Sequence, residues 1–313
     1  MSTYQTLLNN VKDGKQLFEI RLQLMKQIEE LTGRKLIVYA ADERKPPPFN
    51  SIESEDIRGF SDLIKGLEGY ALDILLNSPG GSAEATAHIV NFLRANFSDI
   101  RFIVPYMAMS AATLMCLAGN EIVMDDRSAL GPIDPQIRIP NPHGSQVIYE
   151  WFPAQVIIDS YEKAREEIQK DARALSIFLP WLTRFGPYIE ICRNAIELSR
   201  ELATDWLKGY MFAYDSRGRK KVKKIVNYLL DHTRHKSHGR RITISEAQRI
   251  GLKISDLRDV PQLRDLIWQL WCAIQFLFDR SPKSKIFENA YGVNWGQDIM
   301  VQPVPAPSPA PPS

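Results

Sequence analysis

Cysteine is scarce in this 313-residue sequence, which holds only Cys116, Cys192 and Cys272. An odd number of cysteines at wide spacings, without a C-x-x-C pair, indicates neither a disulfide framework nor a zinc site. A cytoplasmic location, where thiols stay reduced, therefore fits the composition best.

An excess of one charge sign is also missing, since 39 basic and 37 acidic residues leave a net charge of +2. We expect no general attraction to nucleic acid or to anionic lipid. The one strongly basic stretch, 217–241, is the only candidate for a nucleic-acid contact, and we interpret it as solvated surface. His232, His235 and His238 stand three residues apart within it, but without a cysteine or carboxylate set at ligand spacing we expect no metal site.

Long apolar runs are absent as well. The longest, 103–117, contains a proline and is shorter than the roughly 18 to 20 residues that span a bilayer. The first 20 residues lack the basic start and continuous apolar core of an export signal. We therefore expect no membrane association.

What the sequence does contain is an alternation of strand and helix signals. Short β-leaning runs are followed by amphipathic stretches, which indicates stacked βαβ units with a largely parallel sheet. The predicted strands are 35–40, 71–77, 101–105 and 121–124, and the predicted helices are 5–32, 57–67, 83–97 and 110–117.

The chain divides by composition into a main domain with additions. Residues 1–34 form a helical extension, 35–260 the main α/β domain with a mostly helical insertion at about 150–235, 261–300 a helical aromatic segment, and 301–313 a disordered proline-rich tail. The segment after Gly131 is rich in turn residues. We interpret the aromatic residues of 261–300, at roughly helical spacing, as part of a core or of a subunit interface, and favour the interface: Trp268, Trp271, Phe276 and Phe278.

The first segment that carries chemistry is 75–85, LLNSPGGSAEA. It places Gly80, Gly81 and Ser82 where a strand ends and a helix begins, and backbone N–H groups at such an entrance can bind an oxyanion. The alternative is a tight turn in which Ser78 or Ser82 caps the helix.

The second segment is 105–115, PYMAMSAATLM, which sets Ser110 among small and apolar residues at a helix start. A hydroxyl in this position suits a nucleophile, and the adjacent Ala111 amide can stabilise the oxygen of a tetrahedral intermediate. A simple helix cap is the alternative.

Taken together, the two segments resemble a known family. LLNSPGG, a serine in MSAAT 29 residues after Gly81, and AGNEIVMDDRSALGPIDPQ resemble the Clp protease, signal peptide peptidase A and crotonase superfamily, and most closely the serine dehydrogenase proteinase family. The likeness spans about 70–136 and returns at 242–254. It implies a Clp/crotonase-like fold and an endopeptidase that forms an acyl-enzyme on Ser110. Gly80, Gly81, Ser82 and Ala111 would bind substrate and oxyanion, without a cofactor, in a homo-oligomer.

The resemblance leaves the general base open. Clp proteases use a histidine soon after the serine, yet this region reads LGPIDPQ, and His143 lies in a proline-rich loop. Signal peptide peptidase A uses a lysine, which points to Lys163, 53 residues beyond Ser110, with Lys170 in reserve. The glutamates around Lys163 favour a solvated helix instead. His238 is the third candidate, as a base, as the residue that orients one, or as a contact for a substrate terminus. A solvated loop histidine is the alternative in so polar a stretch.

Two other functions stay open. A crotonase-like enzyme would use the same amides to stabilise an acyl-coenzyme A enolate, and would not need Ser110. A catalytically silent scaffold would recruit partners through the basic stretch and the proline-rich tail. No G-x-G-x-x-G motif supports a dinucleotide-dependent dehydrogenase.

Overall fold

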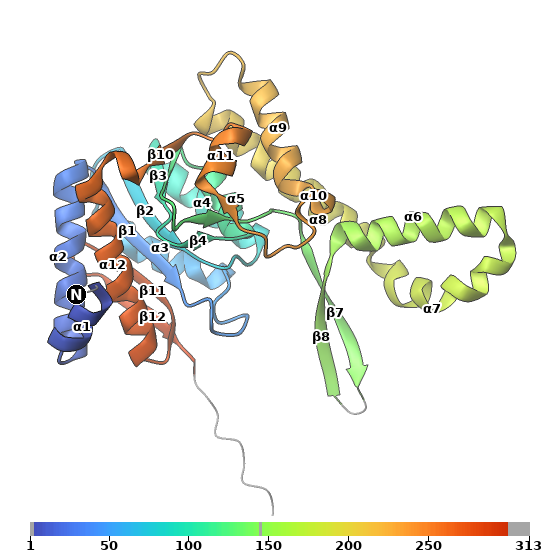
Figure 1. Ribbon diagram of the computed structural model, residues 1–313, viewed down its shortest axis with the longest axis horizontal. Coiled ribbons are helices and arrows are strands. Elements are labelled where there is room, and N and C mark those ends of the chain that lie inside the picture. The colour runs from blue at the N-terminus through green and yellow to red at the C-terminus, as the bar shows by residue number, and fades with distance from the viewer. Residues whose placement is uncertain (1–2, 144–145, 300–313) are drawn as a thin grey trace, which may run out of the picture.

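A seven-stranded sheet forms the centre of the computed structural model, which describes residues 3–143 and 146–299 (Figure 1). The strand order is β10-β5-β3-β2-β1-β11-β12, and the first five strands are parallel. The predicted α/β class is confirmed. The strands are β1 (Lys35–Ala41), β2 (Ala71–Asn77), β3 (Asp99–Ile103), β5 (Glu121–Met124), β10 (Ile254–Asp256), β11 (Lys283–Asn289) and β12 (Asn294–Asp298).

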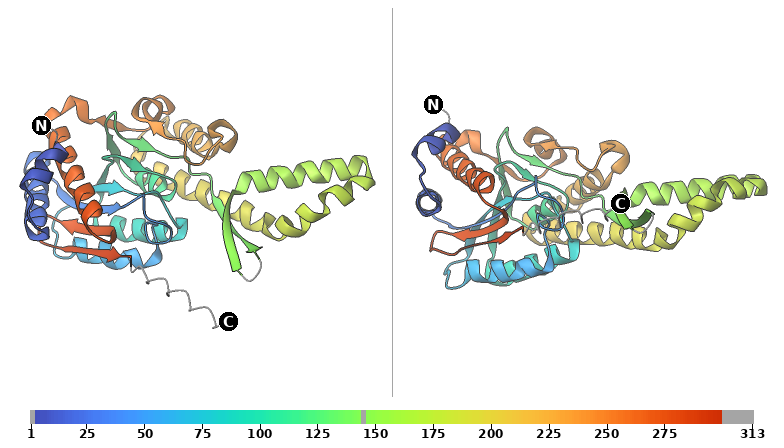
Figure 2. Two further views of the ribbon diagram at one scale, coloured as in Figure 1. Left: turned by 60° about the horizontal axis from the view of Figure 1, so that its bottom comes forward. Right: turned by 90° about the horizontal axis from the view of Figure 1, so that it is seen from below.

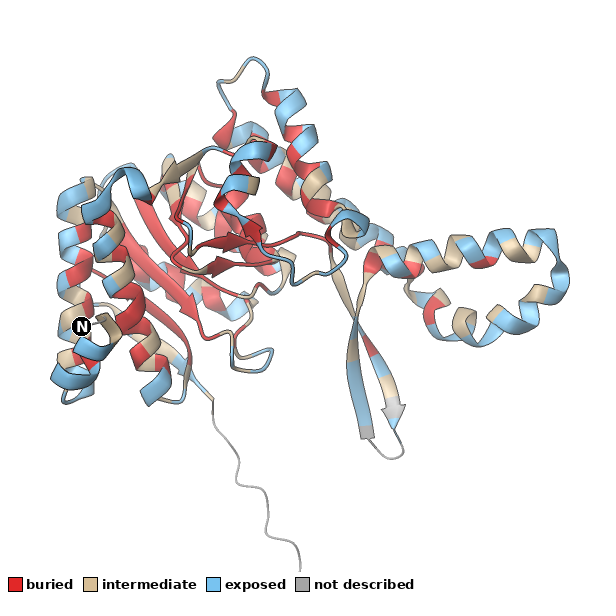
Figure 3. Ribbon diagram, viewed as in Figure 1, coloured by how far each residue is buried: buried red, intermediate tan, exposed pale blue. Residues whose placement is uncertain are grey.

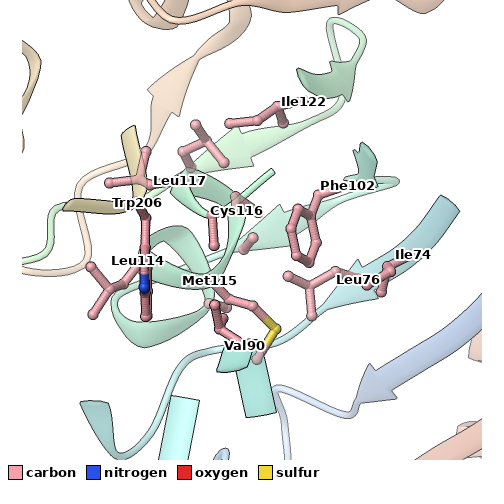
Figure 4. Packing of buried hydrophobic residues seen from close by; sticks show 14 of the residues in the cluster. Ile74, Leu76, Val90, Phe102, Leu114, Met115, Cys116, Leu117, Ile122 and Trp206 are labelled. Carbon is pink, nitrogen blue, oxygen red and sulfur yellow. The ribbon is translucent and has the colours of Figure 1, made fainter. Parts of the chain in front are cut away.

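The parallel strands are near-continuous apolar runs because helices cover both faces of the sheet. Ile37 pairs with Ile74, Ile74 with Phe102, and Phe102 with Ile122, so one row of side chains crosses four strands. The last three of these residues lie together in the core shown in Figure 4. Strands β1, β2, β5 and β11 are buried almost throughout, whereas β10 at the edge of the sheet is half-buried (Figure 3).

Two layers of helices enclose the sheet. On one face α2 (Gly14–Thr32) and α12 (Pro261–Arg280) pack against each other and against the strands, with α1 (Thr3–Asn10) beside them. The other face carries α3 (Ile57–Ile64), α4 (Ala83–Asn96), α5 (Ala111–Leu117), α9 (Gly218–Leu230) and α11 (Ile244–Ile250). A small second sheet joins β4 (Met107–Ala108), β6 (Ala129–Leu130) and β9 (Ile242–Thr243).

The single helix predicted over 5–32 is two helices. Asp13 separates them, because its backbone is extended. Its side chain accepts a hydrogen bond from the Gln16 N–H and so caps the start of α2. Helix α2 ends at Gly33 in a left-handed conformation, as the sequence indicates.

The C-terminal segment corrects two predictions. Residues 283–298 are not helical, because β11 and β12 extend the central sheet beyond β1. The aromatic residues of α12 do not form an exposed interface either, since Trp271, Phe276 and Phe278 are buried by the chain itself and only Trp268 is half-buried. The tail 301–313 lies outside the described residues.

The insertion forms an arm that extends away from the body (Figures 1 and 2). The arm consists of the hairpin β7 (Gln136–His143) and β8 (Gln146–Pro153), followed by α6 (Ala154–Lys170), α7 (Leu175–Phe185) and the first part of α8 (Ile189–Trp206). The sequence predicted turns where the hairpin lies. Pro140 and Pro142 interrupt the strand pattern in the sequence. Strand β7 tolerates them because it pairs only with β8, in a two-stranded sheet.

The arm has its own small core, which includes Ile139, Ile157, Phe185 and Ile189. Its outer surface is apolar in places, with exposed Val147, Ile148, Tyr149 and Trp151 on β8 and Ile177 on α7. Among the described residues, no helix combines the length and apolar character needed to cross a bilayer.

Gly59 on α3 offers a test of how closely this core is packed. A Cβ on Gly59 would lie 2.3 Å from the Phe287 ring and 2.5 Å from that of Trp295, which stack on each other. We expect Gly59→Ala to lower the free energy of unfolding by about 1–3 kcal/mol, although alanine favours a helix over glycine by about 1 kcal/mol. Urea unfolding measures this.

Gly14→Ala is the matched control, because nothing lies within 4 Å of its added Cβ at the start of α2. It should leave stability unchanged or slightly raised. A Gly59→Ala variant as stable as the Gly14→Ala variant would contradict the packing.

Candidate active site

The two motif segments lie side by side at the carboxyl ends of β2 and β3. The Ser78 N–H donates to Met107 O and the Met109 N–H donates to Ser78 O, both at 3.0 Å. The Asn77 side chain adds a bond, since its Oδ1 accepts from the Met107 N–H at 3.0 Å. Segments 75–85 and 105–115, separate in sequence, therefore form one structural unit.

Ser110 has an unusual backbone conformation, with φ 52° and ψ −119°. Among the described non-glycine residues only Lys236 also has a positive φ. A conformation of this kind costs of the order of 1–3 kcal/mol and is concentrated at functional sites. The Ser110 hydroxyl does not cap α5, so the structure differs from the simple helix-cap interpretation.

Gly80 makes the approach to Ser110 possible. Its φ is 112°, and a Cβ on it would lie 2.8 Å from Ser110 Cβ and 3.2 Å from the Ala111 N. The Gly80 N–H donates to Ser78 Oγ at 3.1 Å. The backbone N–H of Ala111, in the first residue of α5, belongs to the helix start whose amides have no acceptor within the helix.

Gly81 is held in a short parallel bridge with Ile52. The Ile52 N–H donates to Gly80 O at 2.7 Å, and the Ser82 N–H donates to Ile52 O at 2.9 Å. Because backbone groups alternate along an extended strand, the N–H and C=O of Gly81 itself point to the other side, away from Ile52. Ser82 ends this strand and caps α4, since its Oγ accepts from the Ala85 N–H at 3.0 Å.

A cavity of about 910 Å³ surrounds these groups. The loop 43–53 forms one part of its wall, while β7, Tyr149 and Trp151 of β8, and Ile191 to Ser199 of α8 form others. The predicted site residues that line it are Gly80, Gly81, Ser82, Ser110, Ala111 and His238.

His238 is attached to a buried carboxylate. Its Nδ1 lies 2.8 Å from Asp134 Oδ1, and the second oxygen of Asp134 lies 2.9 Å from His232 Nδ1. The Asp134 side chain is only 4% exposed. When Nδ1–H donates to a carboxylate, Nε2 keeps its lone pair, which is the tautomer that a general base needs.

The LGPIDP segment, residues 130–135, positions Asp134. The Gly131 N–H donates to Thr113 Oγ1 at 2.8 Å, and the Ile133 N–H donates to Leu229 O at 2.9 Å. The segment therefore connects α5 with the end of α9. It places Asp134 next to the turn that carries His232 and His238. The sequence pattern alone assigns no role to this aspartate, because its histidine partners lie 98 and 104 residues further along the chain.

The three histidines do not share one set of partners. His235 turns away from Asp134, and its Nε2 bonds to Tyr228 O at 2.7 Å while burial lowers the pKa of its imidazole. Across residues 3–143 and 146–299, no group of three or more histidine, cysteine or acidic side chains could hold a metal ion.

The part of the cavity wall formed by the loop 43–53 contains two carboxylates, those of Glu43 and Glu53. Burial raises the pKa of the Glu43 carboxyl and that of Glu53, while Lys285 acts on Glu53 in the opposite direction. Lys45 from the same loop and Arg138 from β7 bring positive charge to the cavity lining.

Lys163 and Lys170 lie on α6 of the arm, and both are exposed to solvent. Neither lines the cavity that contains Ser110. Lys170 pairs with Glu167 at 3.0 Å, as expected for a solvated helix. The geometry thus brings His238, and not Lys163, into the cavity of Ser110.

Comparison with solved structures finds peptidases of low similarity. A mutant of the 1510-N membrane-bound stomatin-specific protease aligns over 69% of this chain and 79% of its own, with 16% identity and a TM-score of 0.40. The catalytic domain of the Plasmodium falciparum ClpP protease aligns over 78% of this chain and 92% of its own, with 14% identity and a TM-score of 0.38.

Sequence comparison finds two uncharacterised proteins of Methanocaldococcus jannaschii. MJ1495 is 25% identical over 241 residues, which cover 75% of this chain and 71% of that protein. MJ0137 is 25% identical over 254 residues, which cover 79% and 77%. Residues 7–272 match the family described as ClpP-like SDH-type serine proteinases. The resemblance found in the motifs is confirmed: the chain belongs to this family of ClpP-like serine proteinases.

Proposed function

We propose that this protein is a serine endopeptidase in which Ser110 is the nucleophile, His238 the general base and Asp134 the residue that orients the base. The observation that carries the proposal is that one cavity contains the strained Ser110 and His238, whose Nδ1 is attached to the buried Asp134. We therefore assign the role of base to His238 and not to a lysine.

The reaction follows from this arrangement. Ser110 Oγ attacks the peptide carbonyl carbon as its proton moves to His238 Nε2, and the N–H groups of Gly81 and Ala111 stabilise the oxyanion. The C–N bond then breaks, and the departing amine takes the proton from His238. Water, deprotonated by His238, hydrolyses the acyl ester and frees Ser110. No cofactor is needed at any step.

The substrate is a peptide in an extended conformation. The outward N–H and C=O of Gly81 are the groups with which a strand pairs, and β7 lines the same cavity through Gln136, Ile137 and Arg138. The substrate binds between the Gly81 strand and the arm.

We also propose a homo-oligomer, because the apolar residues Val147, Ile148 and Ile177 are exposed on the arm, where a second copy can cover them. The proposed compartment is the cytoplasm, in keeping with three cysteines that are free and buried. The basic stretch 217–241 lies on α9 and the histidine turn, and we assign it no nucleic-acid partner.

Labelling with a fluorophosphonate probe tests the nucleophile and its base. We expect labelling at Ser110 alone and none in Ser110→Ala. The labelling rate should fall about 10²- to 10⁴-fold in His238→Gln and in Asp134→Asn, because each removes the base or its required tautomer. Peptide mass spectrometry locates the label, and hydrolysis of a casein digest gives the parallel measure of activity.

Lys163→Met and Lys170→Met are the controls, since both side chains lie outside the cavity, and we expect unchanged rates. A loss of labelling in Lys163→Met, with His238→Gln unaffected, would contradict the histidine assignment. Tight binding of coenzyme A by a folded protein that takes no label would favour the acyl-coenzyme A alternative.

Gly81→Ala tests the extended segment 80–82 that pairs with Ile52, called the oxyanion strand below. The added Cβ would lie 2.3 Å from the Ile52 N and 2.4 Å from its O, and the glycine φ is 153°. The strand must shift, so we expect kcat/KM to fall about 10²- to 10³-fold, the usual effect of losing one oxyanion donor.

Gly69→Ala separates backbone strain from displacement, because Gly69 has a φ of 116° but nothing within 4 Å of an added Cβ. We expect this variant to lose some stability and keep its activity. Equal losses of kcat/KM in the two variants would show that strain alone explains the effect of Gly81→Ala.

A further inference from the structure

A buried ion pair lies behind the loop that holds Gly81. Lys285 on β11 is 1% exposed, and its Nζ lies 2.7 Å from Asp56 Oδ1 and 2.9 Å from Ser51 O. The other oxygen of Asp56 accepts from the Tyr39 hydroxyl at 2.8 Å and from the Glu53 N–H at 3.1 Å. These contacts hold both ends of the segment 51–56.

Ile52 stands inside the segment that this pair holds. It is fully buried, and its backbone makes both hydrogen bonds of the bridge to the strand of Gly81. Gly80, the next residue back, approaches Ser110 so closely that a Cβ would overlap it. A continuous chain of contacts therefore runs from Lys285 through Ser51 and Ile52 to the oxyanion strand.

Filling this buried site does not by itself require a charged pair. Removing one partner of a buried pair is strongly destabilising, yet replacing both by apolar or neutral groups is often tolerated. Lys285 makes a contact that a hydrophobic residue of similar size cannot, because its ammonium group donates to a backbone carbonyl and a carboxylate at once. That double contact ties β11 to the loop.

We propose that Lys285 and Asp56 are positioning residues, which hold the segment 51–53 against Gly81 and thereby keep the Gly81 N–H directed at the reacting carbonyl. This inference rests on the proposed function, since it takes Gly81 as an oxyanion donor. The pair touches neither the substrate nor Ser110.

The same strand supplies a matched comparison. Glu288 on β11 pairs with Arg21 on α2 at 2.7 Å, and both side chains are at most 2% exposed. Lys285 and Glu288, three residues apart, point to opposite faces of the sheet. The Arg21–Glu288 pair therefore matches the Lys285–Asp56 pair in burial and charge but faces away from the loop 43–53.

The experiment compares Lys285→Met/Asp56→Asn with Arg21→Met/Glu288→Gln and with wild type, so that neither variant keeps a lone buried charge. Hydrogen–deuterium exchange over 50–56 and 78–84 reports the bridge, and the fluorophosphonate rate constant reports Ser110. We expect exchange about 10- to 100-fold faster in the Lys285 variant alone, and labelling about 10- to 100-fold slower because a displaced catalytic group costs this much.

Exchange over 78–84 that stays unchanged in the Lys285 variant, or that accelerates equally in both variants, would overturn the proposal. So would faster exchange with an unchanged labelling rate. Failure of the wild type to label would instead count against the proposed function, and exchange would still decide whether the pair holds the strand. If the double variant does not fold, Tyr39→Phe removes one bond to Asp56 and should accelerate exchange over 78–84 to a smaller extent.

Discussion

The close approach of the Gly80 backbone to Ser110 is the constraint on which the active-site geometry depends. A serine with φ 52° is stable only where its surroundings hold it, and here the Ser78–Met109 pairing and the missing Cβ of Gly80 do so. Any side chain at Gly80 would push the two strand ends apart. The proposed nucleophile and the proposed oxyanion donors are thus one packed unit.

Several other segments of the chain complete the site around this unit. The parallel sheet places the carboxyl ends of β2 and β3 at one edge, where ligand sites of α/β proteins commonly form. The LGPIDP segment crosses to α9 and presents Asp134 to His238. Strand β11, which the sequence placed outside the main domain, supports the loop next to Gly81. The arm forms the remaining wall of the cavity with a core of its own.

Local patterns predicted much of the central architecture. The strands 71–77 and 121–124 have the predicted bounds, since continuous apolar runs between turn residues leave little choice. The hairpin β7–β8 and the pair β11–β12 were missed because their patterns are interrupted, by prolines in β7 and by charged residues such as Lys285 and Glu288 in β11. Those charges are acceptable in a buried strand only because partners distant in sequence neutralise them.

By itself the sequence determined the local chemistry of the site, namely a strand end with two glycines and a serine at a helix start. These depend on backbone rules that act over a few residues. Only the tertiary structure brings Asp134 and His238 to the cavity of Ser110, because these two residues are 104 positions apart and no spacing rule joins them. The resemblance to signal peptide peptidase A pointed to Lys163, yet that residue lies out on the arm. Contacts between distant segments follow from topology and packing, which local sequence does not specify.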